Sequence, residues 1–88
     1  MTNVKFGLSP DGQWIVVEFE DDGGRVIINI KRAYVVSTYW SNIHDPPSVY
    51  ITTVYDEPIR VHRFHLTKDE YSAFREMLMS GRDPREGD

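Results

Sequence analysis

Residues 14–20 carry apolar side chains at every second position. In an extended chain this spacing places Ile15, Val17 and Phe19 on the same side of the backbone. A repeat of two residues is typical of a β-strand with one buried face. Asp21, Asp22 and two glycines follow, which favours a hairpin turn and a return strand over residues 25–30. A four-residue turn would place Glu20 opposite Arg25, a favourable pairing of charges.

The clearest helical signal stands near the other end of the chain. Thr67 and Glu70 have the spacing of a capping box, in which each side chain binds the backbone N–H of the other residue. Apolar residues then recur at helical spacing, and Gly81 stands where a glycine commonly ends a helix. The pattern predicts a helix over residues 68–80.

The remaining β-forming segments complete an α+β pattern. They are rich in β-branched and aromatic residues and occupy positions 4–8, 33–40, 49–55 and 59–66. We expect five to six mostly antiparallel strands over residues 4–66 in one twisted or rolled sheet, with the C-terminal helix packed on it. Because 88 residues leave room for one core, residues 1–81 are predicted to form a single domain. The charged residues 82–88 are predicted to be a flexible tail.

The segment 49–55 is uncharged and strongly β-forming. At an exposed edge it would invite aggregation. It is therefore predicted to be central in the sheet, or else paired across a two-fold homodimer.

In the segment 59–66 the apolar side chains change sides. Ile59 and Val61 share one side, whereas Phe64 lies on the other. A β-bulge near His62 and Arg63, or a strand that crosses between sheet surfaces, would place all the apolar residues in the core.

Composition narrows the classes of function. Ten Lys and Arg against fourteen Asp and Glu give a net charge of −4, so bulk attraction to nucleic acid is not expected. The absence of cysteine excludes disulfides, thiolate metal sites and a cysteine nucleophile. No apolar run is long enough to span a bilayer, so we expect a cytoplasmic protein without a membrane partner. No catalytic or phosphate-binding motif is present, so we expect neither a cofactor nor an enzyme.

Aromatic and arginine side chains are the most informative candidates for binding. Tyrosine, tryptophan and arginine are the residues that most often dominate the energy of protein interfaces. We therefore expect a protein-interaction module that uses the sheet or the loop at residues 41–48, with an acidic hairpin as a second docking surface. The candidate partner-binding residues are Tyr39, Trp40, His44, Arg60, His62, Arg63, Asp21 and Asp22.

Two alternatives belong to other classes of function. Aromatic rings beside lysine and arginine on a sheet also suit single-stranded nucleic acid, although the net charge disfavours it. A metal-dependent enzyme using His44, His62 and His65 is the third hypothesis, but their spacing matches no metal-site signature.

Overall fold

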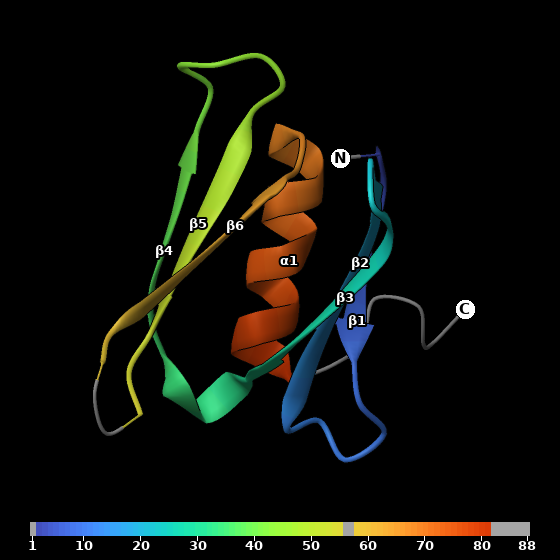
Figure 1. Ribbon diagram of the computed structural model, residues 1–88. Helices are drawn as coiled ribbons and strands as arrows, with labels where there is room; N and C mark the ends of the chain where they lie inside the picture. Colours follow the sequence, from blue (N-terminus) through green and yellow to red (C-terminus); the bar gives the residue numbers. More distant parts are fainter. Residues whose placement is uncertain (1, 56–57, 82–88) are drawn as a thin grey trace.

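The computed structural model describes residues 2–55 and 58–81, and the predicted tail at 82–88 lies outside these ranges. The elements follow the order β1 (Thr2–Leu8), β2 (Trp14–Asp21), β3 (Gly24–Lys31), η1 (Arg32–Tyr34), β4 (Val35–Ser41), β5 (Ser48–Thr53), β6 (Arg60–His65) and α1 (Lys68–Ser80). The element η1 is one turn of 3-10 helix. The predicted α+β class is confirmed, and Figure 1 shows α1 between two groups of strands.

The strands form two sheets, so the prediction of one continuous sheet is wrong. The first sheet has the order β1-β2-β3 and the second has the order β4-β5-β6, both antiparallel. The physical reason is η1. This turn redirects the chain at the end of β3, so β3 and β4 do not pair with each other. The backbone N–H of Arg32 donates to Gln13 at 2.8 Å, and the carbonyl of Tyr34 accepts from Val54 at 2.9 Å. These two bonds tie η1 to segments next to each sheet.

The predicted hairpin of β2 and β3 is confirmed. Glu20 lies opposite Arg25 as expected, but Asp21 also pairs with Gly24, so the connecting loop has two residues rather than the predicted four. The ion pair of Arg25 is nevertheless with Glu18, its diagonal neighbour across the hairpin. Long side chains reach diagonal neighbours in antiparallel pairs, so register alone did not fix the charge partner. The alternation is also confirmed, because the inward side chains are all buried, namely Ile15, Val17 and Phe19.

The helix α1 joins the two sheets into one core. Its predicted capping box is present, with the N–H of Glu70 donating to Thr67 Oγ1 at 3.2 Å and the N–H of Thr67 donating to Glu70 Oε1 at 2.9 Å. The fully buried ring of Phe74 lies 5.3 Å from Phe6 of the first sheet and 5.7 Å from Phe64 of the second, both edge-on. One helical side chain therefore contacts both sheets.

The end of α1 is held by Arg32. The guanidinium donates from Nε to the carbonyl of Leu78 and from Nη1 to the carbonyl of Gly12, each at 3.0 Å. A cation at this position opposes the negative end of the helix dipole. Gly81 caps the helix in the left-handed region with φ 72°, as predicted, and a Cβ there would stand 2.9 Å from Arg32 Nη1.

The strand β5 is the central strand of the second sheet, which confirms the central position predicted for the segment 49–55. The strand itself ends earlier than predicted, at Thr53. Val49 and Ile51 are fully buried and face the helix side of the sheet together with Phe64.

The strand β6 contradicts the prediction for segment 59–66. Its pairing with β5 is continuous from Arg60 to His65, so it contains neither a bulge nor a crossing between sheets. Ile59 and Val61 were expected in the core but are 65% and 60% exposed. Because these two residues stay outside, the change of apolar phase before Phe64 needs no irregularity in the backbone.

Candidate functional site

The outer face of the second sheet is the face that points away from α1 (Figure 1). Strand register aligns Tyr39 of β4, Tyr50 of β5 and Arg63 of β6 in one row across this face. Tyr39 is 59% exposed, and its ring lies 6.2 Å from the half-buried ring of Tyr50. Two aromatic rings and a guanidinium therefore stand side by side on three different strands.

Arg63 is held in place by its neighbours. Its guanidinium lies 5.9 Å from the centre of the Tyr50 ring, and its Nε donates to Ser48 Oγ at 3.2 Å. The hydroxyl of Ser48 is buried and also lies 3.1 Å from Nδ1 of His65. A buried hydroxyl with two partners is suited to positioning Arg63 rather than to attacking a substrate. Within residues 2–55 and 58–81, no carboxylate forms an ion pair with Arg63.

An apolar side chain borders this row. Val61 lies on the same side of β6 as Arg63, two residues away, and pairs with Thr52 of β5. Its side chain is exposed although valine prefers burial. The outer face thus combines an exposed aromatic ring, an exposed aliphatic side chain and a cation.

The structure places Trp40 on the opposite face from its neighbour Tyr39. Trp40 is half-buried, its Nε1 donates to the carbonyl of Leu66 at 2.9 Å, and its ring stacks 6.4 Å from Tyr71 of α1. The phenolic oxygen of Tyr71 also lies 2.9 Å from Thr38 Oγ1. Trp40 thus connects the second sheet to the helix and does not share a surface with Tyr39.

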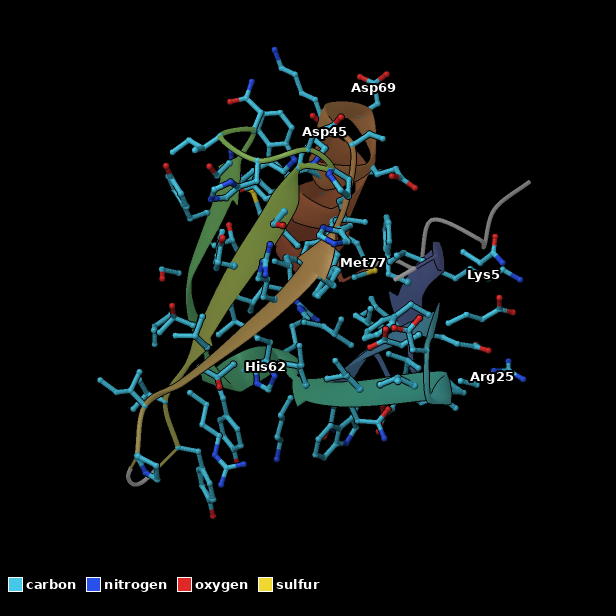
Figure 2. The ribbon with its side chains drawn as sticks, turned by 45° about the horizontal axis from the view of Figure 1, so that its top comes forward. Lys5, Arg25, Asp45, His62, Asp69 and Met77 are labelled. Carbon is cyan, nitrogen blue, oxygen red and sulfur yellow. The ribbon has the colours of Figure 1, made fainter. Side chains whose placement is uncertain are left out.

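Arg60 and His62 lie together in a cleft between the two sheets. Figure 2 shows His62 between β6 and the segment that joins β3 to β4, and both side chains line the same cleft. Burial, and secondarily the positive charge of Arg60, lower the pKa of His62 below its usual value of 6.5. The neutral form of its imidazole therefore predominates at pH 7.

The other candidate residues lie on separate surfaces. His44 is exposed in the loop between β4 and β5, and Asp21 and Asp22 are exposed at the tip of the β2–β3 hairpin. Of the eight candidates, the structure brings together Tyr39 with Arg63, and Arg60 with His62.

The histidines do not gather into one site. His62 faces the cleft, whereas His65 contacts Ser48 on the outer face. In the part of the chain that the structure describes, no group of three or more His, Asp or Glu side chains is arranged to hold a metal ion. Within the same ranges, no helix has the length and apolar character needed to cross a membrane.

Three residues of the outer face were not predicted as site residues, namely Ser48, Tyr50 and Val61. Tyr50 stood in an aromatic strand, but its alignment with Arg63 depends on the register between β5 and β6. Val61 was assigned to the core because of its hydrophobicity. Knowledge of that register would have identified all three.

Comparisons with protein-family models, with curated proteins and with solved structures found no match for this chain.

Proposed function

We propose that this protein is a cytoplasmic, non-enzymatic protein-interaction module whose interface is centred on Tyr39, Val61 and Arg63. Such a module would act as an adaptor, an inhibitor or a subunit of an assembly. The observation that carries the proposal is Arg63, whose guanidinium is oriented by Ser48 and Tyr50 but has no carboxylate partner in the described chain.

The energetics of protein interfaces support this choice of surface. Tyrosine and arginine supply much of the binding energy at interface hot spots. Arg63 is already ordered by one hydrogen bond and one ring contact, so less side-chain entropy is lost when a partner binds. The exposed side chain of Val61 adds apolar area that a partner would remove from water.

The chemistry of the surface also describes the partner. Arg63 is suited to a carboxylate on the partner, because a guanidinium and a carboxylate form two parallel hydrogen bonds. The ring of Tyr39 and the side chain of Val61 are suited to an apolar residue beside that carboxylate. The acidic hairpin tip at Asp21 and Asp22 provides a second contact for a partner with a basic region.

The test is a pull-down of the tagged protein from its host lysate, with and without nuclease. The wild-type chain is expected to retain a stoichiometric protein that survives nuclease treatment. The double variant Tyr39→Ala/Arg63→Gln is expected to lose it, because hot-spot residues contribute about 2 kcal/mol or more each to binding.

The matched control is Ile27→Ala/Lys5→Gln. It also removes one large exposed side chain and one positive charge, but from the first sheet. The control is expected to bind as the wild type does. A partner kept by Tyr39→Ala/Arg63→Gln would refute the proposed interface, and a partner set that vanishes with nuclease would favour nucleic-acid binding instead.

A further inference from the structure

A cleft of about 450 Å³ opens between the two sheets, on a different surface from the outer face of the second sheet. Its walls come from β2, β3 and η1 on one side and from the β5–β6 region on the other. Its aromatic, cationic and histidine lining consists of Trp14, Lys31, Tyr34, Tyr55, Arg60 and His62. The volume lies within the range of small-molecule sites, about 300–1,000 Å³.

The charge of this cleft is opposite to that of the whole chain. Apart from tyrosine, the titratable side chains that line it in the described ranges are Lys31, Arg60 and His62, in a protein of net charge −4. Neither Lys31 nor Arg60 forms an ion pair with a described carboxylate. The pKa of Asp11 is lowered mainly by hydrogen bonds from Ser9 and Gln13. The positive charge of Lys31 contributes least to this lowering. Within the described ranges, two positive charges are therefore available to an anion.

Aromatic rings stand directly beside Lys31. Tyr34 and Tyr55 stack with their centres 4.3 Å apart and their planes 13° from parallel. Lys31 Nζ lies 5.1 Å from the centre of the Tyr34 ring and 5.9 Å from that of Trp14. Trp14 is 40% exposed and Tyr55 is 63% exposed, so ring surface remains accessible to a ligand. Bases of single-stranded nucleic acids stack on rings of this kind.

We propose that this cleft binds a nucleoside 5′-phosphate unit, with the phosphate beside Lys31 and Arg60 and the base against the aromatic rings. An inorganic anion would leave the rings unused, and an uncharged aromatic compound would leave both cations unused. The neutral imidazole of His62 and the amide of Asn29 supply hydrogen bonds at the same cleft. The unit is either a free mononucleotide or one residue of a single strand, since both present the same chemistry.

The two tryptophans of the chain provide a direct readout. Trp14 lines the cleft, whereas Trp40 does not, and its indole N–H is bonded to the carbonyl of Leu66. In a titration of the full ¹⁵N-labelled chain with AMP, the Trp14 indole resonance is expected to shift and saturate while the Trp40 resonance stays in place. Adenosine and inorganic phosphate, tested separately, are expected to bind more weakly than AMP.

Variants connect the binding to the two cations. The double variant Lys31→Met/Arg60→Met is expected to weaken AMP binding by about 100-fold or more by calorimetry, since a hydrogen bond to a charged group contributes about 1.5 kcal/mol or more, roughly tenfold, and two cations are removed. Lys68→Met/Arg75→Met removes the same charge from the exposed surface of α1 and is expected to leave the affinity unchanged. An unchanged Trp40 resonance in each variant verifies the fold.

Each outcome decides the proposal. It is overturned if AMP does not move the Trp14 resonance, if phosphate alone binds as tightly as AMP, or if both double variants weaken binding equally. A short oligoadenylate distinguishes the two sources of the unit. Tighter binding of the oligomer through Lys31 and Arg60 indicates a single strand, and equal or weaker binding indicates a free mononucleotide.

Discussion

Substituting two adjacent aromatic residues of β4 is expected to have very different effects on stability. Trp40→Phe removes the hydrogen bond from Nε1 to the carbonyl of Leu66, 2.9 Å long, and part of the ring that stacks on Tyr71. Loss of one hydrogen bond costs about 1 kcal/mol. Loss of aromatic packing adds about 0.5–1.5 kcal/mol. The free energy of unfolding is therefore expected to fall by about 1.5–2.5 kcal/mol.

Tyr39→Phe is the matched comparison in the same strand. Tyr39 is 59% exposed, and its hydroxyl makes no hydrogen bond with a described residue. A surface substitution of this kind changes the free energy of unfolding by about 0.5 kcal/mol or less.

Urea denaturation followed by far-UV circular dichroism measures both variants without relying on tryptophan emission. The expected loss in Trp40→Phe corresponds to a fall in Tm of about 6–20 °C, since about 1 kcal/mol shifts a domain of this size by about 4–8 °C. Equal stabilities for the two variants, or a larger loss in Tyr39→Phe, would refute the assignment of Trp40 to the inner face and Tyr39 to the outer face.

Three further predictions concern the end of α1 and the cleft. Arg32→Met removes the donors to the carbonyls of Leu78 and Gly12 and is expected to lower the free energy of unfolding by about 2–3 kcal/mol, measured by urea denaturation. A loss below about 0.5 kcal/mol would show that water replaces these bonds fully. Gly81→Ala is expected to cost about 1–2 kcal/mol, because alanine is strained at φ 72° and its Cβ would meet Arg32. The cost should be smaller in the Arg32→Met background, and an identical cost in both backgrounds would exclude the steric contribution. The pKa of His62 is lower in the folded state than in the unfolded state. At pH values between these two pKa values the unfolded state therefore binds more protons. Stability is therefore expected to be full above pH 6.5 and to fall as the pH decreases from 6.5 toward the folded pKa. Thermal unfolding of His62→Gln should show a flatter pH profile, and an unchanged profile would contradict the assignment.

Local patterns predicted the local parts of this fold. The two-residue repeat before Asp21 and the glycines after Asp22 define the β2–β3 hairpin through neighbouring residues alone. The caps of α1 at Thr67 and Gly81 are also local, because each depends on atoms within four residues. Such features follow from backbone geometry and need no knowledge of the remaining chain.

The division into two sheets could not be predicted in this way. It depends on η1, whose position is fixed by hydrogen bonds to Gln13 and Val54, and on Phe74 entering between the sheets. Each of these contacts joins residues far apart in the sequence. Hydrophobicity alone also predicted the wrong environment for Val61, because a solvent-facing valine and a core valine have the same local pattern.

The candidate site was predictable only in part. Tyr39 and Arg63 followed from residue type, but their alignment through Tyr50 depends on the register of two strand pairs. The side on which Trp40 lies depends on the position of the helix. The cleft between the sheets was not foreseen, because a single-sheet arrangement contains no such space.

Photo-cross-linking from position 39 tests the proposed interface most directly. A benzoylphenylalanine at position 39 is expected to cross-link one discrete protein in the host, insensitive to nuclease, and to lose it when Arg63→Gln is added. The same probe at position 27, an equally exposed site on the first sheet, should not capture that protein. Capture from position 27 alone, capture at 39 that is unaffected by Arg63→Gln, or no protein cross-linked from position 39 would contradict the assignment of the outer face as the interface.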